Sequence, residues 1–97
     1  MTNPAYLIAN VKVTDPEQYE KYRVYSSKAI AEYGAQIIVR GGEMEVLEGQ
    51  AYQRTIVLKF VSMAQAKQFY ESETYRTGRE LRKDASEGMI IIVEGVM

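Results

Sequence analysis

Residues 5–40, AYLIANVKVTDPEQYEKYRVYSSKAIAEYGAQIIVR, carry the signals of a strand, a helix and a second strand in turn. The first nine residues, 5–13, are rich in side chains that favour strands and have the length of a single strand. The last six, AQIIVR at 35–40, have the same character. A helix between two such strands crosses over one face of their sheet, so this stretch predicts a strand–helix–strand unit.

The helix in this unit has recognisable ends. Asp15 can cap its first turn and Pro16 suits the first helical position, although Thr14 could cap the helix one residue earlier. Apolar residues then recur at helical spacing, and Gly34 is the kind of residue that ends a helix. We therefore predict a helix from about Pro16 to Tyr33.

Two glycines, Gly41 and Gly42, interrupt the chain after the second strand. They are compatible with a hairpin turn or with a sharp bend in one long strand, and the sequence does not distinguish the two. We expect a second extended piece at 43–48 (EMEVLE), a loop at 49–53 and a strong strand at 54–61 (RTIVLKFV).

The remaining residues predict a second crossover. Ser62 can cap a helix, Ser72 can end it and start a further helical segment, and Gly88 is expected to close that segment. Residues 89–96 (MIIIVEGV) are predicted as the last strand. Right-handed crossovers place both helices on one face of the sheet. The fold class is therefore α+β: a single domain over 1–97, a ferredoxin-like βαββαβ sandwich with an antiparallel sheet.

Composition excludes several kinds of function. The chain has 97 residues, a formal net charge of −1, no cysteine and no histidine. Nucleic-acid binding needs a concentrated basic face, which this charge balance does not favour. Without Cys or His, a zinc site, a histidine-ligated haem and a Ser-His-Asp triad cannot be built within this chain. We expect neither a transition metal nor an organic cofactor.

No membrane segment is expected either. The longest apolar run, Met89 to Val93, is far too short to span a bilayer. The N-terminal residues lack the basic-then-apolar layout of a signal peptide. A cytoplasmic location is compatible with these features and with the absence of cysteine.

Side chains alternate across each predicted strand, which divides the sheet residues into two sets. We expect the set facing the helices to be Leu7, Ala9, Val11, Ile37, Val39, Ile56, Leu58, Phe60, Met89, Ile91 and Val93. The opposite set mixes apolar and polar residues: Tyr6, Ile8, Ile38, Val57, Ile90 and Ile92 with Asn10, Arg40, Lys59 and Glu94. The open sheet face of a monomer should be polar. A homodimer packed through this face is therefore favoured over a monomer with a partly apolar sheet.

An ordered set of residues runs through nearly the whole chain: Tyr6, Thr14-Asp15-Pro16, Tyr19, Tyr22, Gly34, Val39-Arg40-Gly41-Gly42, Val46-Leu47-Glu48-Gly49, Phe60, Ala66, Phe69-Tyr70, Tyr75 and Glu94-Gly95. In this set the sequence resembles the uncharacterised domain-of-unknown-function family 1330, within the dimeric α/β-barrel superfamily. The resemblance implies a ferredoxin-like fold and a dimer with sheets face to face, and no established activity. The wider superfamily includes cofactor-free monooxygenases of polycyclic phenols, haem-degrading enzymes, small-ring isomerases and ligand-binding modules.

Four residues are the candidates for a ligand site: Tyr22, Arg40, Tyr75 and Arg79. Arg40 lies at a strand end before two glycines and could bind a carboxylate or phenolate through its fork. Tyr75 and Arg79 are one helical turn apart and could point into one pocket. That pocket is expected between the first helix, the sheet and the segment after Ser72. A small anionic or aromatic ligand is favoured, because two arginines there would otherwise lack a counter-charge.

Each candidate also has an ordinary interpretation. Arg40 could pair with Glu43 or Glu94, and the tyrosines could fill the margin of the core with their hydroxyls at the surface. The basic run that contains Arg79 and Arg82 could be a solvated helix face.

Three functions fit this sequence. The first is a cofactor-free enzyme acting on a small aromatic or carboxylic substrate. There Arg40 would stabilise developing negative charge, and a tyrosine or Glu94 would move a proton. The second is a small-molecule binding module without turnover, and the third is a purely structural dimer. Assays with phenolic and lactone substrates would separate the first two, which share every sequence feature.

Overall fold

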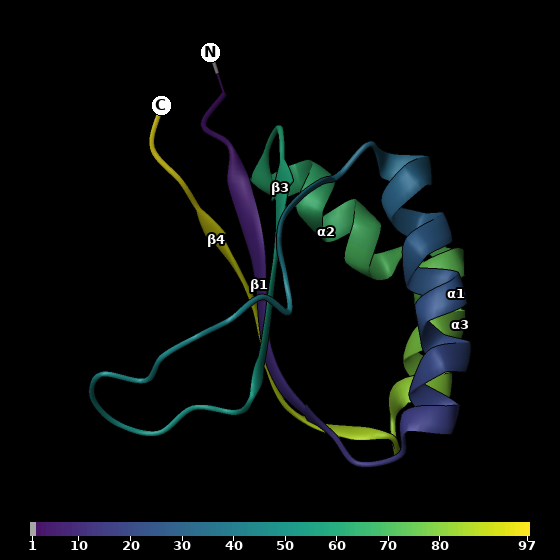
Figure 1. Cartoon of the computed structure of the whole chain (residues 1–97). Helices are drawn as coiled ribbons and strands as arrows, with labels where there is room; N and C mark the ends of the chain where they lie inside the picture. Colours follow the sequence, from purple (N-terminus) through teal and green to yellow (C-terminus); the bar gives the residue numbers. More distant parts are fainter. Residues whose placement is uncertain (1) are drawn as a thin grey trace.

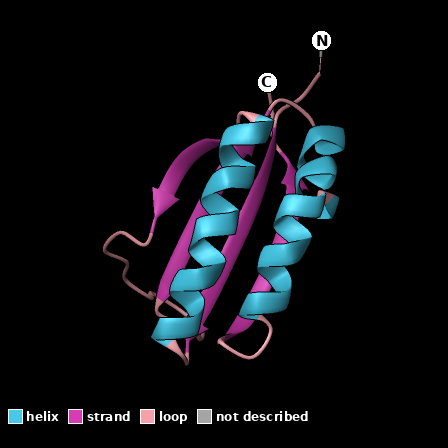
Figure 2. Cartoon of the chain, turned by 90° about the vertical axis from the view of Figure 1, so that its right-hand side faces the viewer, coloured by secondary structure: helices cyan, strands magenta, loops and turns pink. Residues whose placement is uncertain are grey.

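The computed structural model describes residues 2–97 and shows one antiparallel sheet with three helices on one of its faces (Figure 1). The elements are β1 (Ala5–Val13), α1 (Pro16–Tyr33), β2 (Gln36–Arg40), β3 (Arg54–Phe60), α2 (Met63–Glu71), α3 (Glu73–Arg82) and β4 (Ser86–Glu94). The strand order in the sheet is β2-β3-β1-β4. Figure 2 shows the helices side by side over the sheet. The predicted α+β ferredoxin-like sandwich is confirmed.

The helix ends follow the capping residues that the sequence offers. Asp15 Oδ1 accepts a hydrogen bond from Gln18 N at 3.2 Å, and Gly34 ends α1 with a φ of 63°. Ser62 Oγ accepts from Gln65 N at the start of α2. Ser72 ends α2 and caps α3, accepting from Tyr75 N at 3.1 Å. These local signals fix where each crossover leaves and rejoins the sheet.

The hydrophobic core lies between the sheet and the helices. Phe60 from β3 and Phe69 from α2 are fully buried, with ring centroids 5.2 Å apart. The other buried residues of this layer are Ala5, Leu7, Ala9, Val11, Tyr19, Tyr22, Ala29, Leu58, Ala66, Tyr75 and Ala85. Among residues 2–97, no helix has the length and apolarity needed to cross a bilayer.

The expected extended piece at 43–48 is wrong. Residues 41–53 form an irregular loop that projects away from the helices (Figure 1); we call it the projecting loop. Gly41 has a φ of 64° and donates its N–H to Thr55 O, after which the chain leaves the sheet. The two glycines are therefore neither a two-residue hairpin turn nor a bend within one strand. Alternating Glu and apolar residues suit a strand, but this segment has no neighbouring strand to bond.

The face assignment of the last strand is also wrong. β4 begins at Ser86, and its register pairs Leu7 with Ile92 and Ala9 with Ile90, so both isoleucines face the helices. The opposite face carries Met89, Ile91 and Val93. An unbroken apolar run has no polar–apolar alternation, so the sequence does not show which of its residues face the helices. The register with β1 determines this. Gly88, expected to close the preceding helix, lies inside β4 opposite Val11.

A β-bulge reverses the expected faces at the end of β2. Ile37 pairs with Leu58, whereas Val39 pairs with Val57 and Arg40 with Ile56, so Ile38 is the extra residue. Val39 therefore points to the open face of the sheet and Arg40 to the helix side, opposite to the expectation. A bulge places two residues against one and so shifts the alternation beyond it. As a consequence, Arg40 lies on the helix side of the sheet, at the exposed end of β2.

The open face of the sheet is apolar at its centre and polar around it. The apolar residues are Tyr6, Ile8, Val39, Val57, Met89, Ile91 and Val93, and the polar ones are Asn10, Lys12, Gln36, Thr55, Lys59 and Glu87. Asn10 on the same face holds the returning end of the projecting loop. Its Nδ2 donates to Tyr52 O and Thr55 Oγ1 at 3.1 Å, and its Oδ1 accepts from Tyr52 N at 2.8 Å. At the far end of the sheet, Gly95 N donates to Pro4 O, so the beginning of β1 and the end of β4 lie together.

Candidate functional site

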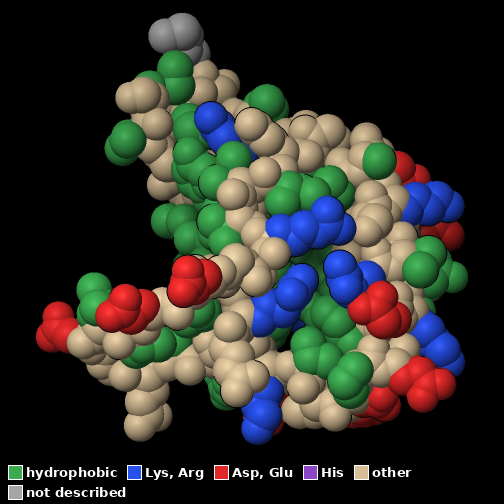
Figure 3. Space-filling model, in the orientation of Figure 1, with side chains coloured by type: hydrophobic (Ala, Val, Ile, Leu, Met, Phe, Trp, Pro, Cys, Tyr) green, Lys and Arg blue, Asp and Glu red, His purple; other side chains and the backbone are tan. Residues whose placement is uncertain are grey.

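A cavity of about 60 Å³ lies between the helix side of the sheet and helices α1 and α3. Its walls are largely apolar, with Ile37, Ile56, Leu58 and Phe69 among them. The polar lining groups are Tyr19, Tyr22, Arg23, Ser26, Ser27, Arg40, Arg54, Tyr75 and Arg82. In Figure 3, basic side chains surround a hollow with an apolar floor.

Two tyrosines meet inside this cavity. Tyr22 on α1 and Tyr75 on α3 place their hydroxyl oxygens 2.8 Å apart, and both side chains are buried. Burial raises the pKa of Tyr22 well above its ordinary value, and the neighbouring Tyr75 raises it further. Burial also raises the pKa of Tyr75. Both phenols are therefore neutral at physiological pH, and they act as hydrogen-bond donors rather than bases.

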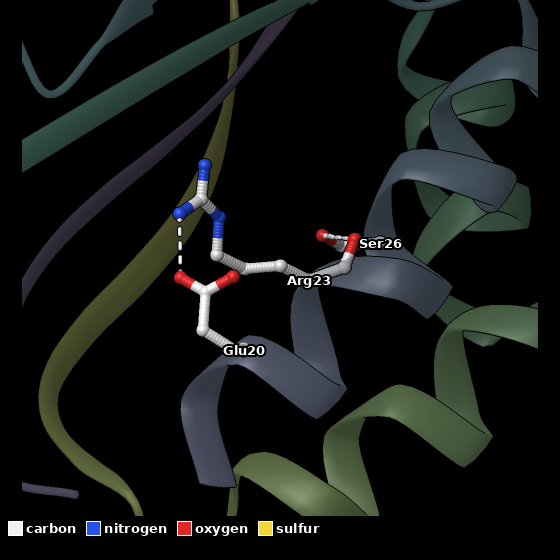
Figure 4. A network of polar contacts seen from close by, with 3 residues as sticks. All are labelled: Glu20, Arg23 and Ser26. Carbon is white, nitrogen blue, oxygen red and sulfur yellow. Dashed lines mark hydrogen bonds and ion pairs between the residues drawn. The ribbon is translucent and has the colours of Figure 1, made fainter. Parts of the chain in front are cut away.

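Positive charge enters the cavity from both walls. Arg23 projects from α1 and is neutralised by Glu20, whose Oε1 lies 2.8 Å from Arg23 Nη1 (Figure 4). Arg40, Arg54 and Arg82 form no ion pair within residues 2–97. The guanidinium of Arg82 lies over the Tyr22 ring, 5.2 Å from its centroid. The buried Nε atoms of Arg54 and Arg82 have no hydrogen-bond partner.

Gly41 explains how Arg54 reaches its position. A side chain at Gly41 would collide with the Arg54 guanidinium, so the missing Cβ leaves room for that group beside the turn. The positive φ of Gly41 suits glycine for the same turn. The close approach that the glycines allow is therefore made by an arginine of the protein itself.

Of the four residues predicted from the sequence, the structure brings Tyr22, Arg40 and Tyr75 to one cavity. Arg79 does not line it: its guanidinium lies over the Tyr70 ring, 4.2 Å from the centroid. Glu94 is exposed at the end of β4, on the opposite edge of the sheet from β2. It neither pairs with Arg40 nor lines the cavity.

The sequence analysis missed the arginines Arg23, Arg54 and Arg82. Arg54 shares the alternation of Ile56 and Leu58, so strand periodicity could have placed it on the helix side. Arg82 follows Tyr75 by seven residues, which is two helical turns, and could have been placed on the same helix face. Arg23 carried no such signal, because it directly follows Tyr22 in a helix.

The cavity can hold negative charge. It offers guanidinium and hydroxyl donors, and no carboxylate lines it. Across residues 2–97, no three acidic side chains gather in a way that could hold a metal ion. Donors without a matching acceptor, in a largely apolar space, suit an oxygen anion.

The strand order and the one-sided helices define this chain as a ferredoxin-like α+β protein with a cavity between its two layers. The chain belongs to the family described as Domain of unknown function (DUF1330), whose model matches residues 4–96. The resemblance noted in the sequence is thereby confirmed. No curated protein matches this sequence.

Several solved structures share the fold. A protein of unknown function from Rhodopseudomonas palustris has a TM-score of 0.81 at 15% identity, over 100% of this chain and 85% of that one. SnoaB, a cofactor-independent oxygenase from Streptomyces nogalater, has a TM-score of 0.63 at 8% identity, over 99% and 96%. A dimeric protein of unknown function from Bacteroides fragilis has a TM-score of 0.58 at 12% identity, over 95% and 96%.

Proposed function

We propose that this protein is a cofactor-free enzyme whose substrate is a small aromatic or carboxylic molecule bound in the cavity as an anion. The observation that carries this proposal is the set of three cavity arginines, Arg40, Arg54 and Arg82, that have no carboxylate partner. Two of them also keep a buried Nε without an acceptor. A bound carboxylate or phenolate would supply both the missing charge and the missing acceptors.

In this proposal the arginines stabilise negative charge as it develops on the substrate. Fixed donors in an apolar space are more effective than water, because they need no reorganisation during the reaction. The tyrosine pair donates a hydrogen bond and does not remove a proton, since both pKa values are raised. The substrate therefore enters as an anion or gives its proton to water.

The oxygenase SnoaB is described as cofactor-independent, so the shared fold can support chemistry without a resident cofactor. A specific observation favours the alternative of a binding module. No carboxylate lines the cavity, and its tyrosines hold their protons, so it contains no evident general base. Binding and turnover must therefore be measured separately.

We also propose that two copies pack through the open sheet face that carries Tyr6, Ile8 and Val57. The centre of this face is apolar although no helix covers it, and Ile38 lies at its β2 edge. The related fold from B. fragilis is described as dimeric. The cavity lies on the other side of the sheet and would stay accessible in such a dimer.

The anion site can be tested with matched ligand pairs. We expect small aromatic carboxylates and phenolates to raise the melting temperature, and the corresponding amides or ethers to have no effect. Arg40→Gln and Arg82→Gln should each reduce the response. Arg76→Gln is a matched control, because Arg76 is exposed on the same helix as Arg82 and does not line the cavity. Each ligand that binds is then incubated in air and its consumption followed.

Equal responses to the carboxylates and their amides would contradict the anion site. Binding without any consumption would leave the binding module as the function.

A further inference from the structure

The size of the cavity limits its ligand. The cavity has about 60 Å³ available to the centre of a water molecule. A space of this size holds only a few ordered waters, so it is comparable with one substituted six-membered ring. A fused polycyclic molecule would exceed this space and would extend out of the cavity into solvent or displace the helices.

The two walls of the cavity offer different donors. The sheet wall contributes Arg40 and Arg54, two positive charges from neighbouring strands. The helix wall contributes the Tyr22–Tyr75 pair with Arg82 beside it. A carboxylate carries a full charge and two acceptor oxygens, which suits the sheet wall. The helix wall combines neutral hydroxyls with one guanidinium and suits a single oxygen.

One hydroxyl hydrogen of the tyrosine pair is free to donate a further hydrogen bond. Two hydroxyls carry two hydrogens, and the 2.8 Å contact between them uses only one. Within the described part of the chain, no protein atom accepts the other hydrogen. The nearby Nε of Arg82 also lacks an acceptor. Both donors can therefore bind one more acceptor oxygen inside the cavity.

We infer that the ligand is a hydroxybenzoate, a single aromatic ring that carries one carboxylate and one phenolic hydroxyl. Its carboxylate binds Arg40 and Arg54 on the sheet wall. Its phenolic oxygen accepts hydrogen bonds from the Tyr22–Tyr75 pair and from Arg82 on the helix wall. This inference rests on the proposed anion site and adds the size of the ligand and its second contact.

Calorimetric titration with five probes tests each element of the inference. The probes are benzoate, 3-hydroxybenzoate, 4-hydroxybenzoate, 4-hydroxybenzamide and 6-hydroxy-2-naphthoate. We expect the better hydroxybenzoate to bind about fivefold more tightly than benzoate, the effect of one added hydrogen bond. We expect 4-hydroxybenzamide and the two-ring naphthoate to bind weakly or not at all.

Two variants assign the contacts. Replacing both tyrosines, as Tyr22→Phe with Tyr75→Phe, removes both hydroxyls and keeps both rings. It should erase the advantage of hydroxybenzoate, so that this variant binds benzoate and hydroxybenzoate equally well. Arg40→Gln should weaken benzoate and hydroxybenzoate alike, by roughly 10- to 100-fold. Arg76→Gln serves again as the control, and thermal unfolding confirms that each variant folds.

These titrations distinguish failure of the hydroxybenzoate inference from failure of the proposed anion site. If benzoate and both hydroxybenzoates bind equally well, the phenolic-oxygen contact is wrong and the anion site stands. If the naphthoate binds as tightly as the single-ring acids, the size limit is wrong. If no carboxylate binds, the anion site itself fails and this inference fails with it.

Discussion

Tyr22 and Tyr75 depend on each other at the level of single atoms, because each buried hydroxyl has the other as its partner. Removing one hydroxyl leaves a buried polar group unsatisfied, whereas removing both leaves two rings of the same shape. We expect Tyr75→Phe alone to lower the free energy of unfolding by about 1 kcal/mol. Adding Tyr22→Phe should restore most of the loss. Urea unfolding of the two variants checks this, and a double variant less stable than the single one would contradict it.

The same pair makes stability depend on alkaline pH. The pKa of both tyrosines is raised in the folded protein, so the unfolded chain loses these protons first as the pH rises. Above about pH 10 the folded state holds more protons, and its stability therefore falls with increasing pH. The full stabilisation is present below that pH. We expect a shallower alkaline decline in the double phenylalanine variant, measured as unfolding free energy between pH 8 and pH 11.

Gly88 occupies a position in β4 where a side chain would be strained and would collide with the neighbouring strand. It has a φ of 148°, and a Cβ there would collide with the carbonyl oxygen of Asn10 on β1. We expect Gly88→Ala to lower the free energy of unfolding by at least about 2 kcal/mol. Gly42→Ala is the control, because a Cβ at Gly42 would meet nothing. Equal unfolding midpoints for the two variants would show that β4 tolerates the side chain.

At the level of elements, the helices could be predicted because their ends are coded locally. Asp15, Gly34 and Ser72 act on residues within one turn of themselves, so a short window of sequence contains the whole signal. The face of β4 could not be predicted from its run of isoleucines, since facing depends on the register with β1. The bulge at Ile38 depends equally on a distant strand, β3.

The candidate site shows the same division between local and distant causes. The family resemblance favours Tyr22 and Tyr75 as residues of one pocket, between the first helix, the sheet and the segment after Ser72. Arg40 was expected there as well, although its strand face was predicted wrongly and the bulge supplied the correct one. Arg79 has the same helical spacing from Tyr75 as a pocket residue would have. Its direction is set instead by the Tyr70 ring, which belongs to another helix.

The projecting loop should depend on a residue of β1. Asn10 makes its contacts with Tyr52 and Thr55 across the open sheet face. We expect Asn10→Ala to free the loop and to speed cleavage by a glutamate-specific protease at Glu43, Glu45 or Glu48 several-fold. Gln68→Ala on the exposed face of α2 is the control. An unchanged cleavage rate would mean that the loop holds its position without Asn10.

At the scale of the whole molecule, the proposed dimer can be tested from the open sheet face. Ile8 lies in the middle of this face on the central strand β1. Ile8→Asp should dissociate the dimer, because packing would bury a charge without a partner. Val24→Asp adds the same charge on α1, where Val24 is 67% exposed, and should leave the dimer intact. Sedimentation at micromolar concentration measures both, and a monomer mass for the unaltered protein would contradict the dimer.

The meeting of Pro4 and Gly95 at one end of the sheet has a mechanical consequence. β1 and β4 are antiparallel neighbours, and tension applied through these two residues would part them at the Gly95–Pro4 hydrogen bond first. The hydrogen bonds between β1 and β4 would then break one after another, each bearing the whole force in turn. In a shear geometry, by contrast, all of these bonds would bear the force together. Stretched between its ends, this domain should therefore yield at low force, however stable it is to heat or urea.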